Sequence, residues 1–172
     1  MEDMKPTPLL AESQIKKRVE EMAGIISSDY PNGLIVIGVL KGAFIFMSDL
    51  VRALQVPVHC DFVKVASYKG KTSSGKISLE LAPNLPNFKK KILLVEDIVD
   101  TGLTISYLKD YFSQNAAVEV KVCCLLDKPS RRKVDISPDY TGFVIEDYFV
   151  VGYGLDYEEE YRSLPYIGYL KE

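Results

Sequence analysis

Short apolar runs rich in β-branched residues, separated by stretches of helical character, constrain the fold of this chain more than any other feature. The runs occupy residues 34–39, 91–95 and 118–126. Each is largely continuous rather than alternating, which is typical of a strand buried on both faces of a parallel sheet. Because parallel strands are joined by crossover helices, the alternation predicts an α/β fold. In such a fold, ligands bind at the carboxyl ends of the strands.

The remaining segments extend this pattern. Helices are predicted over residues 15–26, 42–54 and 103–112, with a shorter one over residues 156–162. Further strands are predicted over residues 56–65, 77–81 and 143–151, with a basic connection over residues 130–141. Residues 67–76, SYKGKTSSGK, combine serine, glycine and lysine. Such a stretch cannot build a core, so we expect a mobile loop there.

Length and charge exclude several classes of protein. A chain of 172 residues is large enough for one domain with its own hydrophobic core. Its 21 basic and 24 acidic residues give a net charge of −3, which argues against binding nucleic acid through bulk charge. The longest strictly apolar stretch, residues 33–40, is far shorter than the roughly 18 residues of a membrane span. The N-terminal segment MEDMKPTPLLAE has no apolar signal region, so we expect a cytoplasmic protein.

The cysteines and the single histidine exclude several catalytic arrangements. Cys60, Cys123 and Cys124 are odd in number and lie in apolar runs, which predicts buried free thiols in a reducing cytosol. His59 neighbours Cys60 in a predicted strand, so the two side chains point to opposite faces and do not form a catalytic pair. One histidine leaves no multi-histidine metal site.

The most informative segment follows the strand predicted over residues 91–95. Glu96 and Asp97 come at its carboxyl end, and residues 100–104, DTGLT, turn the chain into a helix. A helix start preceded by threonine and glycine exposes free backbone N–H groups, a cradle for one phosphate group. Carboxylates beside an anion site fit ribose hydroxyls or a divalent cation. A sugar phosphate therefore suits both the acidic residues and the phosphate-binding turn. A P-loop is excluded because no GxxxxGK[ST] occurs.

Several segments, in sequence order, resemble one known family. Residues 95–104, VEDIVDTGLT, resemble the signature of the purine phosphoribosyltransferases that use phosphoribosyl pyrophosphate. Residues 39–42, 151–157 and 161–168 extend the resemblance to the bacterial-type hypoxanthine-guanine phosphoribosyltransferases over nearly the whole chain. The resemblance implies an α/β type I phosphoribosyltransferase fold in a single domain, residues 1–172. It also implies a small hood built from the N-terminal segment and residues 128–172.

The resemblance implies roles for the acidic strand end and the turn after it. Glu96 and Asp97 hold the ribose diol and one Mg²⁺, partly through water, and Asp156 binds a second Mg²⁺. Asp100 is the catalytic general base, acting at purine N7. The 5′-phosphate lies on the turn formed by Asp100, Thr101, Gly102, Leu103 and Thr104.

The same resemblance implies the other two subsites. Pyrophosphate contacts Lys41, Gly42, Ser67, Tyr68 and Arg162, the Leu40–Lys41 peptide can be cis, and the loop that begins at Ser67 and Tyr68 closes over it. The purine is bound by Lys128, Phe149, Val150 and Asp156. Lys128 donates to O6 of hypoxanthine or guanine, and adenine is rejected because its amine offers this cation no acceptor. The products are IMP or GMP and pyrophosphate.

Simpler explanations remain for these residues. The acidic segment can be a solvated loop whose threonine caps a helix. Lys41 can be a lysine at a helix start, Phe149 a core residue, and Arg162 the surface partner of Glu158 four residues earlier. Residues 158–160, three glutamates, are interpreted as a solvated face.

Two other functions and the oligomeric state stay open. A regulator on the same fold that senses phosphoribosyl pyrophosphate could bind nucleic acid through Lys128, Arg131, Arg132 and Lys133, although the negative net charge argues against it. An enzyme that prefers xanthine would use the same machinery. By family resemblance we expect a homodimer or homotetramer without a membrane partner.

Overall fold

A six-stranded sheet forms the centre of the molecule. The computed structural model describes residues 5–67, 77–83, 91–115 and 117–171. In spatial order the strands are β4 (Ile77–Leu81), β3 (Val58–Ser67), β2 (Leu34–Leu40), β5 (Lys91–Val99), β6 (Glu119–Asp127) and β7 (Tyr140–Val144). All neighbours are parallel except β4, which runs antiparallel to β3 at one edge. The predicted α/β class with a mainly parallel sheet is confirmed.

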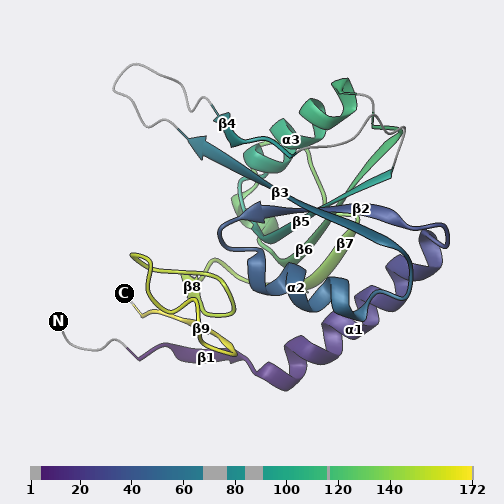
Figure 1. Ribbon diagram of the computed structural model, residues 1–172. Helices are drawn as coiled ribbons and strands as arrows, with labels where there is room; N and C mark the ends of the chain where they lie inside the picture. The colour runs from purple at the N-terminus through teal and green to yellow at the C-terminus, as the bar shows by residue number, and fades with distance from the viewer. Residues whose placement is uncertain (1–4, 68–76, 84–90, 116, 172) are drawn as a thin grey trace, which may run out of the picture.

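Helices cover both faces of this sheet (Figure 1). The helices α1 (Glu12–Asp29) and α2 (Phe44–Ala53) lie on one face and α3 (Leu103–Gln114) lies on the other. Successive strand residues point to opposite faces, so each strand contributes to both layers. Val36 and Leu93 pack in the cluster beneath α1 and α2, whereas Ile37 and Leu94 pack beneath α3. All four are fully buried, which explains why these strands are apolar without alternation.

The first helix follows directly from its sequence. Its buried residues Ile15, Val19, Met22 and Ile26 recur at spacings of three and four and form one apolar stripe. The Gln14 side chain accepts a hydrogen bond from the Ala11 N–H at 2.8 Å, which satisfies a free donor at the helix start. The helix ends at Asp29, shortly before Pro31, as predicted.

A second, three-stranded sheet joins the two ends of the chain. It consists of β1 (Thr7–Leu10), β9 (Ile167–Tyr169) and β8 (Val150–Val151), in that order and all antiparallel. It lies beyond one edge of the central layers (Figure 1). This sheet is the hood that the family resemblance implies. Its strands are two to four residues long and β1 contains a proline, so no sequence pattern marks β1 or β9.

The prediction of a short helix over residues 156–162 is wrong. This segment is a tight turn in which Tyr157 and Glu160 form an isolated antiparallel bridge. The two residues between them, Glu158 and Glu159, have φ angles of 52° and 68°. Two consecutive left-handed residues build a hairpin turn rather than a helix. Glycine or asparagine usually marks such a turn in a sequence, but glutamates occupy these positions here, so the sequence gives no turn signal.

Two further expectations need correction. The strand predicted over residues 143–151 is divided between β7 and β8, which belong to different sheets, and the exposed acids Glu146 and Asp147 lie in the break. Cys60 is exposed, whereas Cys123 and Cys124 are buried as predicted, and all three are free. The partner strand β4 pairs with β3 only from Lys64 onward, so Cys60 lies on an open sheet edge. Among the described helices, none is both long and apolar enough to cross a membrane.

Candidate functional site

Parallel pairing brings the carboxyl ends of β2, β5 and β6 to one edge of the sheet. Gly38 of β2 pairs with Val95 of β5, and Val99 of β5 pairs with Asp127 of β6. The segments that follow these strands therefore meet at this edge. A cavity of about 240 Å³ opens there, lined by Val39, Leu40, Gly42, Val65, Glu96, Asp97, Ile98, Val99, Asp100, Thr101, Gly102, Thr104 and Ile105. The structure thus gathers the acidic strand end, most of the turn after it and Gly42 around one space.

The turn after β2 lies directly against Asp97. The peptide bond between Leu40 and Lys41 is cis, as the resemblance implies. A Cβ atom on Gly42 would stand 1.7 Å from Oδ2 of Asp97. Only a residue without a side chain permits this approach. The contact fixes the distance between the end of β2 and the acids of β5.

Glu96 and Asp97 form an enclosed acidic pair. Glu96 is 8% exposed, and burial together with the adjacent charge of Asp97 raises its pKa well above the usual carboxyl value. Burial also raises the pKa of Asp97, although its Oδ1 accepts the Ile98 N–H at 2.8 Å. The pair is held in an environment that disfavours its charge. A cation or a set of hydroxyl donors would relieve this cost.

The turn from Asp100 to Thr104 leads into the N-terminus of α3. Gly102 has a φ of 79°, and a Cβ there would lie 2.5 Å from Cγ2 of Ile136, so both conformation and space require glycine. The helix begins at Leu103, and the N–H groups of its first turn have no partner within the helix. The Thr101 N–H donates to the Asp100 carboxylate, and the Leu103 N–H makes a long 3.4 Å contact to the Thr101 hydroxyl. Leu103 is not among the residues that line the cavity, and it is 38% exposed.

Arg132 holds the backbone of this turn, a role the sequence does not reveal. Its Nη1 donates to the carbonyl oxygens of Val99 at 2.9 Å and Asp100 at 2.6 Å, and its Nη2 pairs with Asp127. The Lys133 N–H adds a bond to the Thr101 carbonyl at 3.0 Å. In the sequence, Arg132 is only part of a basic cluster, and no spacing rule predicts its inward direction.

The predicted purine-binding residues lie beyond the end of β6. Lys128 is 7% exposed, its Nζ donates to the Tyr148 carbonyl and lies 3.7 Å from Asp147, and burial lowers its pKa. Phe149 is 53% exposed and meets Tyr157 edge to face at 5.6 Å. The alternative that Phe149 is a core residue is therefore wrong. Val150 is buried in β8.

A chain of ion pairs links the end of β2 to the hairpin turn at residues 157–160. Nζ of Lys41 lies 2.9 Å from one carboxylate oxygen of Glu159, and Nη2 of Arg162 lies 3.2 Å from the other. Arg162 also pairs with Asp156 at 2.9 Å. Glu159 is thus not part of a simple solvated face. The expected Arg162–Glu158 pair is not among the ion pairs of the described residues.

Two of the predicted pyrophosphate contacts, Ser67 and Tyr68, stand where one described part of the chain ends. Ser67 is the last residue of β3, and Tyr68 with the rest of the predicted loop lies outside the described residues.

Within the described residues, no group of three or more carboxylate, histidine or cysteine side chains is arranged to hold a metal ion. The two oxygen-rich acids at 96 and 97 nonetheless suit Mg²⁺, which takes one or two carboxylates and completes its shell with water and substrate phosphates.

The fold and the arrangement of its strand ends place the protein in the class of type I phosphoribosyltransferase folds. Residues 7–158 match the phosphoribosyl transferase domain family. The hypoxanthine-guanine phosphoribosyltransferase of Bacillus subtilis is 46% identical over 165 residues, covering 95% of this chain and 92% of that protein. That of Aquifex aeolicus is 47% identical over 160 residues, covering 91% of this chain and 90% of that protein.

A solved structure agrees with these relatives. The crystal structure of a hypoxanthine-guanine phosphoribosyltransferase from Bacillus anthracis matches with a TM-score of 0.91 at 41% identity and covers 98% of this chain and 99% of that one. The chain belongs to the phosphoribosyltransferase family, within it to the hypoxanthine-guanine phosphoribosyltransferases, and is a glycosyltransferase-type enzyme.

The enclosed acidic pair predicts a pH-dependent stability difference. A carboxyl group whose pKa is raised by folding destabilises the protein increasingly as pH rises from its unfolded to its folded pKa. We expect Glu96→Gln to raise the melting temperature of the protein in chelator-containing buffer by about 2–4 °C at pH 8 and by much less at pH 5. Thermal unfolding followed by circular dichroism measures this, with Glu20→Gln on the exposed face of α1 as control. A difference independent of pH would contradict the assignment.

Proposed function

We propose that the protein transfers the phosphoribosyl group from phosphoribosyl pyrophosphate to N9 of hypoxanthine or guanine, in purine salvage. The observation that carries this proposal is the small cavity that Glu96, Asp97 and the turn from Asp100 share with Gly42. Proteins similar to this chain over more than 90% of its length are hypoxanthine-guanine phosphoribosyltransferases. Acids for a ribose diol, an anion-binding turn and a purine-facing lysine are the parts that this reaction needs.

The sugar phosphate accounts for the mixture of charges at the end of β5. Its 5′-phosphate accepts hydrogen bonds from the amides and hydroxyls of the turn, at the positive end of α3. Its two ribose hydroxyls donate to Glu96 and Asp97, whose pKa values are raised chiefly by burial, so added hydrogen-bond donors would stabilise their charged forms. The Arg132 contacts to two carbonyl oxygens keep the turn in shape for the phosphate.

Pyrophosphate is proposed to lie between the turn after β2 and Arg162. The backbone of Lys41 and Gly42 follows the strand end directly and offers amide donors. Nε of Arg162 is buried and has no hydrogen-bond partner among the described residues, so it is a donor free for an anion. Glu159 pairs with both cations in this structure, and the more highly charged pyrophosphate is expected to replace it.

The purine is proposed to stack on Phe149 with its O6 facing Lys128. The exposed ring of Phe149 offers a flat apolar surface. The ammonium of buried Lys128 has three N–H donors, so it can donate to O6 in addition to the Tyr148 carbonyl. Val150 contributes backbone groups at the ring edge. Asp156 pairs with Arg162 in this structure. It is proposed to contact the purine and to hold a second Mg²⁺.

The chemistry breaks the C1′–O bond largely before the bond to N9 forms, so positive charge develops on the ribose ring. Asp100 is proposed to accept the proton at purine N7, and its carboxylate would favour the neighbouring positive charge. Glu96 and Asp97 orient the ribose through its hydroxyls. The same two acids would hold Mg²⁺, which would supply neutralisation of the charge on the departing pyrophosphate.

A nucleic-acid-binding regulator receives little support. The basic cluster that could serve it is mostly committed to contacts within the protein. Arg132 pairs with Asp127, Arg131 lies 3.2 Å from Asp147, and Lys128 donates to the Tyr148 carbonyl. Few of its charges are left for phosphate backbones.

A purine panel tests the proposed function. The protein is incubated with phosphoribosyl pyrophosphate, Mg²⁺ and hypoxanthine, guanine, xanthine or adenine, and nucleotide formation is followed by chromatography. We expect IMP and GMP, no AMP, and no product when the cation is chelated. Xanthine turnover above that of both other 6-oxopurines would favour the xanthine enzyme, and absence of any nucleotide would contradict the proposal.

The same panel tests the purine contact with a pair of variants. Lys128→Met removes the buried donor and is expected to lower kcat/KM for both 6-oxopurines by about tenfold to a hundredfold, the effect of leaving a substrate oxygen without a charged donor. Arg131→Met, which removes a neighbouring exposed cation, should leave turnover close to that of the unmodified protein. Equal effects of the two variants would remove Lys128 from the purine site.

Asp100→Asn separates catalysis from binding. Asparagine keeps the shape of the side chain but cannot accept the N7 proton. We expect kcat to fall about 100-fold or more while the KM for phosphoribosyl pyrophosphate changes only a few-fold. Steady-state kinetics with both substrates varied provides the measurement. An unchanged kcat would exclude Asp100 as the general base.

A further inference from the structure

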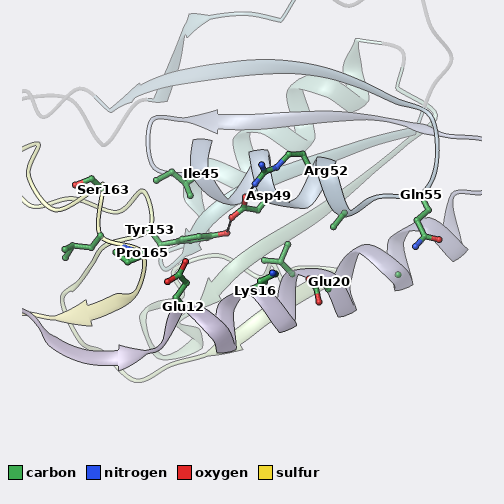
Figure 2. Close-up of a pocket in the computed structure, with 14 residues that line it drawn as sticks. Glu12, Lys16, Glu20, Ile45, Asp49, Arg52, Gln55, Tyr153, Ser163 and Pro165 are labelled. Carbon is green, nitrogen blue, oxygen red and sulfur yellow. Dashed lines mark hydrogen bonds and ion pairs between the residues drawn. The ribbon is translucent and has the colours of Figure 1, made fainter.

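A partly buried tyrosine–aspartate hydrogen bond connects two segments that border the site. The hydroxyl of Tyr153 donates to Oδ2 of Asp49 at 2.6 Å. Asp49 lies in α2, and Tyr153 lies in the segment between β8 and the hairpin turn. Figure 2 shows the phenol extending from this segment to the carboxylate along the wall of a cavity of about 900 Å³ between α1 and α2. This cavity is separate from the smaller one at the strand ends.

The backbone around Tyr153 is held in an uncommon conformation. Gly152, Tyr153 and Gly154 have φ angles of 98°, 52° and 101°, so three consecutive residues are left-handed. Glycine adopts such angles freely, but a bulky residue keeps them only where surrounding contacts enforce them. Tyr153 has two such contacts, the hydroxyl bond to Asp49 and a 2.9 Å bond from its N–H to the Leu164 carbonyl.

This segment touches both parts of the proposed pyrophosphate subsite. A Cβ on Gly154 would lie 2.1 Å from the carbonyl oxygen of Gly42, so the segment packs directly on the turn after β2. The Gly154 carbonyl accepts from Nη1 of Arg162 at 2.7 Å, and its N–H donates to the Arg162 carbonyl at 2.9 Å. Gly154 therefore stands between Gly42 and Arg162.

We propose that Tyr153 and Asp49 are a positioning pair that sets the separation between the Gly42 turn and Arg162. The inference rests on the proposed function, because it assigns pyrophosphate to that gap. The helix α2 begins two residues after Gly42, and the Phe44 N–H donates to the Lys41 carbonyl at 3.2 Å, so α2 is joined directly to the turn by the chain and by a hydrogen bond. Anchoring Tyr153 on α2 therefore fixes the segment that carries Arg162 relative to that turn.

Tyr153→Phe removes the bond and keeps the ring in place. The adjoining cavity allows water to reach the Asp49 carboxylate, so the variant is expected to fold. We expect the KM for phosphoribosyl pyrophosphate to rise about fivefold, the effect of losing one positioning hydrogen bond, with the KM for hypoxanthine within twofold of its original value. Such a division between the two substrates does not follow from general destabilisation.

Tyr140→Phe is the matched control. Tyr140 is 8% exposed and donates to Oδ2 of Asp29 at 2.6 Å, the same bond length and chemistry as at Tyr153, which is 6% exposed. It begins β7 at the opposite edge of the sheet from the site. We expect Tyr140→Phe to lower the melting temperature about as much as Tyr153→Phe while both KM values stay within twofold.

Variants at the acceptor complete the test. Asp49→Asn keeps an oxygen acceptor for Tyr153 and should retain the original KM, whereas Asp49→Ala should match Tyr153→Phe. Both changes also remove the charge of Asp49 that pairs with the exposed Arg52, so Asp49→Asn is the control for that loss. The double variant Tyr153→Phe/Asp49→Ala should be no worse than the more impaired single variant, because both lose the same bond. Equal KM values for phosphoribosyl pyrophosphate in Tyr153→Phe and Tyr140→Phe, or an equal rise for hypoxanthine, would overturn the pair's role. An unmodified protein that forms no nucleotide would instead contradict the proposed function itself.

Discussion

The parallel pairing of β2 with β5 is the constraint on which the candidate site depends. Gly38 and Val95 are the last residues that pair between β2 and β5, and beyond them the two strands separate. Gly38 also lets α2 approach the sheet, because a Cβ there would stand 2.4 Å from the Met47 sulfur. The turn after β2 is thereby held against the acids in the carboxyl-terminal half of β5, with Gly42 in contact with Asp97. Apolar packing of the central strands thus determines where the polar groups meet.

The polar groups gathered at this edge are not arranged for stability. Glu96 and Asp97 are enclosed side by side, and both have raised pKa values because burial disfavours their charge. Lys128 is buried at the end of the neighbouring strand, and burial lowers its pKa. Groups with perturbed pKa values cluster at functional sites because burial and neighbouring charges there are arranged for chemistry rather than for stability. The surrounding apolar core, with Leu93 and Leu94 fully buried, supplies the stability that such an arrangement costs.

The fold and the centre of the site could be predicted from the sequence because their signals are local. The apolar runs at β2, β5 and β6 define the sheet, and Glu96, Asp97 and the Asp100–Thr104 turn are contiguous in the chain. Contacts between distant segments leave no such signal. The inward direction of Arg132, the approach of Gly42 to Asp97 and the contact of Glu159 with Lys41 all depend on how loops are placed by the finished fold. The hairpin turn at residues 157–160 escaped prediction because glutamates occupy its left-handed positions.

The central claim is that one ribose 5-phosphate is held jointly by the carboxylates at 96 and 97 and by the turn at residues 100–104. A crystal structure of the protein with ribose 5-phosphate tests it most directly. We predict phosphate oxygens at about 2.7–3.2 Å from the amides of the turn, and ribose hydroxyls at the same distance from Glu96 and Asp97. A sugar phosphate bound elsewhere, or one whose hydroxyls face away from both carboxylates, would contradict the account.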